Sequence, residues 1–227
     1  MKLAKTLSVV TCSSLLFTLS ALSSKAEAVE VSGDLTFVSD YAFRGISQTD
    51  EAAAIQGGLT LAGDSGFYLS VWGSSVDFGG QGTLELDVLF GWSGDIAEDW
   101  SADVGIMRYG YPNTEIAGSN FWELYGSVSY KDITLGLNYS DDFYANTGTY
   151  YYIYAGYSLA LTEQLSVDFH IGQNEFSDDS SASYLDYGVT LSTEVLGLGL
   201  SLAYIDTDIK ECTLCDSRVI FGVSKGF

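Results

Sequence analysis

Residues 84–91 read LELDVLFG, and the alternation in this stretch decides the fold. One parity carries large apolar side chains and the other carries polar or small ones, as in Leu84, Leu86, Val88 and Phe90 against Glu85, Asp87 and Gly91. A period of two is typical of a β-strand with one apolar face, whereas a helix repeats its apolar positions every three or four residues. The stretch therefore predicts a two-faced strand.

The same alternation recurs from residue 29 to the end of the chain. We count twelve such segments, which begin near Val29, Ala54, Gly66, Leu84, Trp100, Phe121, Ile133, Tyr150, Leu165, Tyr184, Leu196 and Arg218. Their lengths suit the roughly 9–11 residues that a tilted strand needs to cross a membrane. The first segment, Val29–Phe43, is expected to pair with the last, Arg218–Phe227, and so to close the sheet.

The connections between these segments alternate in length. Short links such as Lys131-Asp132 take turns with long ones such as residues 109–120, and residues 93–99 are an exception among the short links. This sorting is typical of outer-membrane barrels, whereas a secreted soluble β-sandwich alternates without it. The sequence therefore predicts an all-β fold, a closed antiparallel transmembrane β-barrel of twelve strands with short periplasmic turns and longer extracellular loops.

Residues 1–28 have the features of a secretory signal peptide. Lys2 and Lys5 precede a mostly apolar stretch, and Ala26-Glu27-Ala28 is a small-x-small cleavage site. We expect cleavage before Val29, which leaves residues 29–227 as the barrel. No apolar run in the chain reaches the roughly 18 residues of a spanning helix, which excludes a helical membrane protein.

The charge of the chain is strongly acidic. There are 30 acidic residues against 9 Lys and Arg, a formal net charge of −21. Three of the basic residues and one acidic residue lie in residues 1–28, so that 29 acids face 6 bases from Val29 onward. This balance argues against nucleic acid as a partner and against anionic lipid surfaces. The expected partners are outer-membrane lipid and small solutes that are cationic or neutral.

Residues 39–49, SDYAFRGISQT, resemble a motif of the TorF-type porin family, whose members were first catalogued as conserved proteins of unknown function. Further similar stretches include AIQGG at 54–58, VWGS at 71–74 and VSKGF at 223–227. The likeness extends over nearly all of residues 29–227. It implies an outer-membrane barrel with porin activity and says little about the solute.

The polar parity of the strands should line the lumen, because lipid contacts the apolar parity. The residues expected to line the pore are Asp34, Asp40, Arg44, Tyr68, Trp72, Glu85, Asp87, Asp103, Glu123, Asp142, Asp168, His170 and Asp186. Fixed carboxylates would concentrate cations and repel anions. Arg44 is expected at the outer end of the first strand, either in a structural salt bridge or at a constriction.

Bulky rings are also expected on the inward parity, among them Tyr125, Tyr150, Tyr152 and Tyr154. A barrel of twelve strands has a modest lumen, so these rings would pack it or narrow it. They would also offer cation–π contacts to a basic solute.

Cys212 and Cys215 lie in the last long loop, in an oxidising compartment, which favours a disulfide between them over a metal site. No metal and no cofactor are expected. The terminal Phe227 closes an amphipathic strand and resembles the signal that the barrel-assembly machinery recognises.

The predicted function is passive diffusion of small hydrophilic solutes through a cation-preferring porin in the outer membrane of a Gram-negative bacterium. A closed barrel with a structural or adhesin-like role is the main alternative. An outer-membrane hydrolase is less favoured, because no motif supplies a nucleophile for His170, and we do not expect an enzyme.

Overall fold

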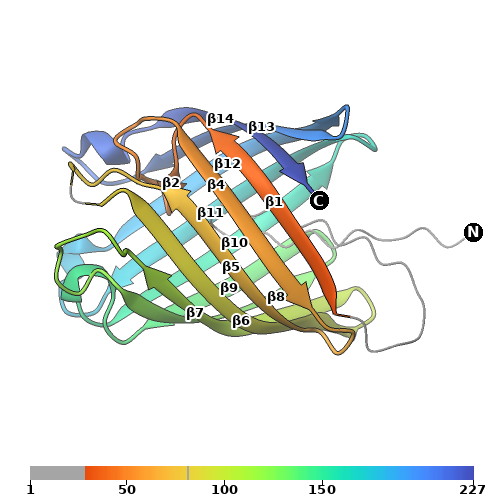
Figure 1. The fold of residues 1–227 in the computed structure, drawn as a ribbon, viewed down its shortest axis with the longest axis horizontal. Coiled ribbons are helices and arrows are strands. Elements are labelled where there is room, and N and C mark those ends of the chain that lie inside the picture. The colour runs from red at the N-terminus through yellow and green to blue at the C-terminus, as the bar shows by residue number, and fades with distance from the viewer. Residues whose placement is uncertain (1–28, 81) are drawn as a thin grey trace, which may run out of the picture.

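The computed structural model describes residues 29–80 and 82–227, and these form a closed antiparallel barrel of twelve strands. Sequence neighbours pair around the barrel, and β1 closes it against β14 (Figure 1). The barrel strands are β1 (Glu30–Val38), β4 (Ala54–Ala62), β5 (Phe67–Ser75), β6 (Leu84–Ala97), β7 (Trp100–Gly110), β8 (Phe121–Tyr130), β9 (Ile133–Ser140), β10 (Tyr150–Ala160), β11 (Leu165–Phe176), β12 (Tyr184–Val195), β13 (Leu198–Thr207) and β14 (Arg218–Gly226). The predicted fold is confirmed. The predicted signal peptide, residues 1–28, lies outside the described residues.

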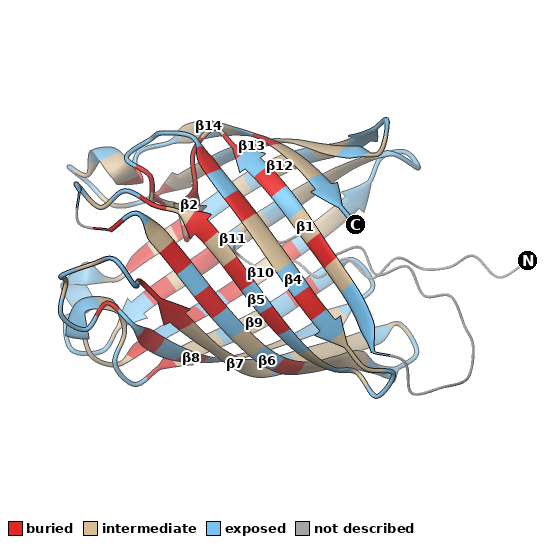
Figure 2. Cartoon of the chain, in the orientation of Figure 1, coloured by how far each residue is buried: buried red, intermediate tan, exposed pale blue. Residues whose placement is uncertain are grey.

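The alternation in sequence becomes an alternation in exposure along each strand (Figure 2). On β1, Leu35 and Phe37 are 57% and 48% exposed, whereas Thr36 and Val38 beside them are buried. A large apolar belt on the outside is unfavourable in water, and it is what a lipid-facing barrel presents. Among the described residues, no helix has the length and apolar character needed to cross a membrane.

The closing seam joins the first and last strands as predicted, but the first strand is shorter than expected. β1 pairs with β14 from Asp34↔Gly226 to Val38↔Gly222. The sheet pairing of β1 ends at Val38, and residues 39–53 turn away from the wall. The expectation that a strand continues to Phe43 is therefore wrong.

The link between β6 and β7 is short, contrary to the expectation for residues 93–99. β6 continues to Ala97 and β7 begins at Trp100, so only Glu98 and Asp99 connect them. Asp99 has a φ of 63°, which makes the tight turn, and a β-bulge between Asp95 and Ala97 shifts the register before it. All the links at this end of the barrel are therefore short.

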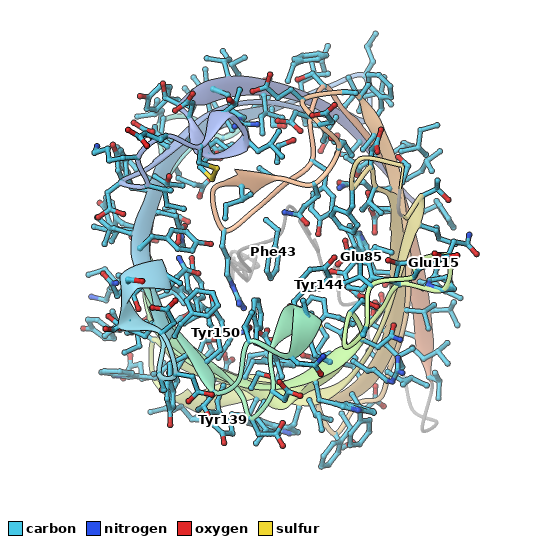
Figure 3. The ribbon with its side chains drawn as sticks, turned by 90° about the vertical axis from the view of Figure 1, so that its left-hand side faces the viewer. Phe43, Glu85, Glu115, Tyr139, Tyr144 and Tyr150 are labelled. Carbon is cyan, nitrogen blue, oxygen red and sulfur yellow. A yellow bond between two sulfur atoms is a disulfide. The ribbon has the colours of Figure 1, made fainter. Side chains whose placement is uncertain are left out.

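The long connections gather at the other end of the barrel, at the left of Figure 1. Three of them contain short 3-10 helices, η1 (Tyr144–Asn146), η2 (Ser180–Ala182) and η3 (Thr213–Cys215). Residues 39–53, which we call the inner hairpin, contain β2 (Ala42–Phe43) and β3 (Ile46–Ser47). Figure 3 looks along the barrel and shows Phe43 inside the ring of strands, with Tyr139 outside it. One loop therefore folds into the lumen.

Candidate functional site

The turn of the inner hairpin places Arg44 at its tip. β2 and β3 are two residues long and pair with each other, so Arg44 and Gly45 form a two-residue turn. Their φ angles are 48° and 84°, and a type I′ hairpin turn requires positive φ at both positions. A Cβ on Gly45 would lie 2.4 Å from Cγ2 of Thr207, so glycine also lets the turn contact the end of β13.

The base of the inner hairpin is held by Asp40. Its Oδ1 accepts hydrogen bonds from Ser47 Oγ at 2.7 Å and from Thr49 Oγ1 at 2.8 Å. Its Oδ2 accepts from an Arg218 nitrogen on β14 at 2.8 Å. These polar contacts draw the chain inward after β1. Asp40 is therefore buried at the hairpin base and is not part of a strand, which corrects the sequence-based placement.

An apolar cluster supports the hairpin from the wall of the barrel. Tyr41 packs edge-on against Trp72 of β5, with the ring centroids 5.5 Å apart. Val38, Ala54 and Val76 complete this buried cluster. Tyr41 thus continues the apolar parity of β1 but buries its ring inside the barrel.

Arg44 forms a two-point ion pair with Glu123 of β8. Its two terminal nitrogens donate to the two carboxylate oxygens at 2.8 Å and 2.9 Å. Glu123 Oε2 also accepts from Tyr109 Oη at 3.0 Å and from Asn138 Nδ2 at 3.1 Å. Arg44 is 3% exposed and Glu123 is 0% exposed, so the pair is shielded from water. A buried two-point pair of this kind is both strong and specific for the planar guanidinium.

The surroundings of Arg44 keep its guanidinium protonated. Burial by itself lowers the pKa of this guanidinium, but the charge and hydrogen bonds of Glu123, together with the neighbouring Tyr150 and Tyr109, hold the pKa of Arg44 well above its usual value. Arg44 therefore remains a cation inside the barrel. It is neither on the first strand nor at that strand's outer end, so the expectation for its position is wrong.

Aromatic rings surround the guanidinium of Arg44. Its central carbon lies 4.3 Å from the ring centroid of Tyr152, 4.5 Å from that of Phe43 and 5.1 Å from that of Tyr150. Phe143 lies at 6.0 Å. These distances are within the range of cation–π attraction. Figure 3 shows Tyr150 beside the inner hairpin within the ring of strands.

Two further buried acids lie on the wall at β6. Glu85 and Asp87 are 1% and 5% exposed. Tyr111 Oη donates to Glu85 at 3.0 Å, and the backbone N–H of Gly110 donates to Asp87 at 3.4 Å. Burial, reinforced by the charge of Glu85, raises the pKa of Tyr111 and of Tyr41, which both lie outside the barrel strands. Both phenols therefore stay neutral.

The inward-facing acids nearer the short turns are less enclosed. Tyr68 Oη donates to Asp103 at 2.8 Å, and Ser158 Oγ donates to Asp168 at 2.6 Å. The residues Asp103, Asp168 and Asp34 are all of intermediate exposure although they face the lumen. The lumen is thus more accessible at the short-turn end than around the inner hairpin.

His170 belongs to a hydrogen-bonded network on the β10–β12 wall. Its Nε2 lies 2.7 Å from Tyr152 Oη and 2.9 Å from an oxygen of Asp186. Asn174 donates to the second oxygen of Asp186 at 2.8 Å. Asp168, which shares the inward face of His170 along β11, bonds Ser158. The network joins the inward faces of three neighbouring strands.

The predicted lining residues therefore divide into groups. Arg44 contacts Glu123, Glu85 and Asp87 form a neighbouring pair, and Asp186 contacts His170. Asp142 is misplaced, because β9 ends at Ser140 and the alternation was carried past the end of the strand. It is exposed in the loop of residues 141–149. Contact residues not included in the predicted lining set are Tyr41, Phe43, Tyr109, Tyr111, Asn138, Phe143, Asn174 and Arg218.

Some of these contacts had a signal in the sequence. Tyr109 shares the inward parity of Asp103 along β7, and Asn138 shares the inward parity of Thr134 along β9. The role of Arg218 had no such signal, because it depends on where the inner hairpin places Asp40.

The last long loop contains the disulfide between Cys212 and Cys215. Cys215 is buried, and its carbonyl oxygen accepts from Thr207 Oγ1 at 2.9 Å, beside the tip of the inner hairpin. Within residues 29–80 and 82–227, no group of three or more His, Cys, Asp or Glu residues is arranged to hold a metal ion.

Comparisons with solved structures agree with this architecture. A structure named KdgM porin matches with a TM-score of 0.60 and 11% identity, over 86% of this chain and 99% of that chain. A NanC porin structure matches with a TM-score of 0.51 and 12% identity, over 87% of this chain and 98% of that chain. At these identities the likeness establishes the fold.

A search of curated proteins finds no match. The model of a family described as "Bacterial protein of unknown function (Gcw_chp)" matches residues 23–226. That range includes every strand of the barrel and the inner hairpin. The chain therefore belongs to the Gcw_chp family.

Proposed function

We propose that the protein is an outer-membrane porin of the TorF type, through which small hydrophilic solutes diffuse passively with a preference for cations. The observation that carries this proposal is a closed barrel with apolar side chains outside and carboxylates inside. Such a barrel is stable where lipid surrounds it and water enters its interior. This supports a location in the outer membrane of a Gram-negative bacterium.

The balance of charge inside the barrel supports cation preference. Of the basic residues after position 28, Arg44 and Arg218 contact buried inward-facing carboxylates, those of Glu123 and Asp40. No basic residue of the described chain forms an ion pair with Asp103 or Asp168. Inward-facing carboxylates without a counter-charge attract cations, and screening in physiological salt extends only over about 8 Å. A cation is therefore favoured along the accessible part of the lumen.

The experiment is the reversal potential across a salt gradient in a planar bilayer. The informative variant is Asp34→Asn with Asp103→Asn and Asp168→Asn, because these three carboxylates face the more accessible part of the lumen. We expect the wild type to prefer cations and the triple variant to lose most of that preference. The preference should also weaken as salt rises, since screening shortens the reach of each charge.

The matched control removes three charges from the exposed loops, with Glu115→Gln, Asp178→Asn and Glu211→Gln. It changes net charge by the same amount and should leave the preference nearly unchanged. Anion preference in the wild type would refute the proposal. Equal effects of the two triple variants would move the selectivity from the lumen to the loops.

A closed structural or adhesin-like barrel is the second candidate, and the inner hairpin is the observation that favours it. Arg44 and Glu123 are almost fully buried, so the lumen is tightly packed around them. If the wild type carries no current while a variant without residues 42–47 conducts, the barrel is closed at rest. A conducting wild type supports the porin.

Enzymatic activity is not part of the proposal. His170 contacts Tyr152 and Asp186, and neither is a serine that this histidine would activate. Loss of a hydrolytic activity in a His170→Ala variant with an intact barrel would contradict this view.

We also propose that the barrel-assembly machinery recognises the last residue, Phe227. The backbone N–H and carbonyl of Phe227 both bond Gly33 of β1 at 2.9 Å, while the side chain is 77% exposed. The ring is thus presented at the seam that closes the barrel. Replacing Phe227 by Ala should lower the assembled fraction in cells, and refolding in detergent should be little affected.

A further inference from the structure

We propose that Glu123 and the rings around it form a binding site for guanidinium-type cations, and that Arg44 occupies this site as an internal ligand. The inference deepens the proposed porin function, since a solute of this class would compete with Arg44 for the lumen. Binding of a guanidinium can be tested without measuring ion current. The proposed site and the proposed porin function can therefore fail separately.

The site matches the shape of a guanidinium and not only its charge. The carboxylate of Glu123 accepts two parallel hydrogen bonds, at 2.8 Å and 2.9 Å. The rings of Tyr152 and Tyr150 lie 4.3 Å and 5.1 Å from the guanidinium carbon. A carboxylate in the plane of the ligand and aromatic rings within contact distance select a flat, delocalised cation over a compact ammonium.

Most of the site belongs to the barrel and would stay when Arg44 leaves. Glu123 is on β8, Asn138 is on β9, and Tyr150 and Tyr152 are on β10. Of the nearest rings, only that of Phe43 is carried by the inner hairpin with Arg44. The wall therefore supplies the charge and two rings to any ligand that replaces the hairpin tip, and Asn138 holds the Glu123 carboxylate in place.

The wall requires a cation at this position. Glu123 is 0% exposed, and besides Arg44 its bonded partners are the neutral Tyr109 and Asn138. Removing one partner of a buried ion pair leaves an uncompensated charge, which is strongly unfavourable. A vacated site therefore favours entry of a cation from solution.

The tip of the inner hairpin is held separately from its base. The polar tip contacts are the ion pair to Glu123 and a hydrogen bond at 3.1 Å from Tyr184 Oη to the Arg44 carbonyl, and Gly45 lies against Thr207 at the end of β13. The base is held by Asp40 and Arg218. A solute that takes the place of Arg44 at Glu123 thus disrupts only the tip contacts.

The lumen reaches this site from the short-turn side. Tyr125 follows Glu123 by two residues on β8, toward the short turn, and it is partly exposed. Asn138, which bonds Glu123, is also partly exposed. A small cation that enters from that end meets these two side chains next to the buried carboxylate.

Tethering makes Arg44 a strong competitor. A ligand attached by a short linker acts at an effective concentration in the millimolar range or above, which raises apparent affinity by about 100-fold or more. A free guanidinium should therefore bind weakly to the wild type. It should bind about 100-fold more tightly once the Arg44 side chain is removed.

The test uses the full chain in detergent with Arg44→Gly, because glycine tolerates the positive φ of 48° at this position. The melting temperature is measured as ethylguanidinium or ethylammonium is titrated at millimolar concentration. We expect Arg44→Gly to melt lower than the wild type, and ethylguanidinium to raise its melting temperature in a saturable way. Ethylammonium should have little effect on Arg44→Gly, and neither probe should shift the wild type over the same range.

Two double variants locate the binding. Arg44→Gly with Glu123→Gln should lose the response to ethylguanidinium. Arg44→Gly with Glu85→Gln should keep it, because Glu85 is an equally buried lumen acid that bonds Tyr111 and not Arg44. If Arg44→Gly does not assemble, the same titration is performed on Arg44→Lys, because the lysine ammonium cannot form the two-point contact with Glu123.

The outcomes separate the two proposals. Equal effects of the two probes, no saturable effect, or a response that survives Glu123→Gln would overturn the guanidinium site. Saturable binding that requires Glu123, in a barrel that carries no current under any condition, would support the site and refute the porin.

Discussion

A carboxylate with no exposed surface depends on the cation beside it, and Glu123 is such a group. Replacing Glu123 by Gln leaves Arg44 buried without a counter-charge. We expect the free energy of unfolding to fall by about 3–5 kcal/mol, which is typical for breaking one side of a buried pair. Urea-induced unfolding in lipid vesicles, followed by tryptophan fluorescence, measures the change.

The control for this prediction is Glu115→Gln, which removes the same charge from an exposed loop position. It should change stability by no more than about 0.5 kcal/mol. Adding Arg44→Gly to Glu123→Gln should recover part of the loss, since the uncompensated guanidinium is then gone. A Glu123→Gln variant as stable as Glu115→Gln would show that the pair adds nothing to the folded barrel.

At the scale of the element, the inner hairpin depends on one glycine for two reasons. Gly45 has a φ of 84°, and a Cβ there would lie 2.4 Å from Cγ2 of Thr207. We expect Gly45→Ala to cost roughly 1–2 kcal/mol for the backbone and about 1–3 kcal/mol more for the overlap. The same urea titration measures the loss, and limited proteolysis should show cleavage within residues 39–53.

Gly79→Ala is the matched control, because Gly79 has a similar φ of 67° with no atom within 4 Å of the added Cβ. It should show the backbone cost alone. If the two alanine variants are equally stable, the contact between the turn and β13 is not needed to dock the hairpin.

The disulfide loop is a second element whose removal has a calculable cost. Cys212 and Cys215 are separated by three positions, and a cross-link that closes so small a loop restricts the unfolded chain only slightly. Changing both to Ser should cost at most about 2 kcal/mol and leave conductance unchanged. Thiol labelling of intact, unreduced cells should leave both cysteines unmodified, and efficient labelling of the pair would contradict the bond.

At the scale of the whole molecule, the barrel wall and its contents are separable. Sheet pairing closes the wall without any residue of β2 or β3. A variant in which a Gly-Ser turn replaces residues 42–47 should therefore keep heat-modifiable migration on gels and carry a several-fold larger current. Shortening the loop of residues 177–183 instead should leave the current nearly unchanged, and an unaltered current in the first variant would show that the inner hairpin does not narrow the lumen.

The strands could be predicted because lipid and lumen impose opposite demands on neighbouring residues. Leu35 and Phe37 face outward while Thr36 between them faces inward, and the sequence shows this contrast as an alternation of apolar and polar residues. The inner hairpin could not be predicted in the same way. Tyr41 and Phe43 continue the apolar parity of β1, yet their rings pack against other aromatic residues inside the barrel. Alternation shows that a residue is apolar. It does not show whether that residue contacts lipid or packs inside the barrel.

The candidate site was predictable to a similar degree. Glu85, Asp87 and Glu123 were expected on the inner wall, and they lie there because strand parity determines direction. Their partners Arg44 and Tyr111 come from loops whose paths have no period. Loop residues also enclose these acids, and the alternation of the strands does not indicate this enclosure.

The contacts between the inner hairpin and β14 also determine when the lumen fills during folding. Arg218 bonds Asp40 across 178 positions of sequence, and the backbone N–H of Phe221 bonds Ser39 Oγ across 182. Contacts this distant in sequence require closure of a very long loop, so they form only after the last strand reaches the first. Closing the wall and forming these base contacts are therefore coupled late events, and a nascent barrel that still waits for β14 has an open wall and lacks the contacts of Arg218 and Phe221 at the hairpin base.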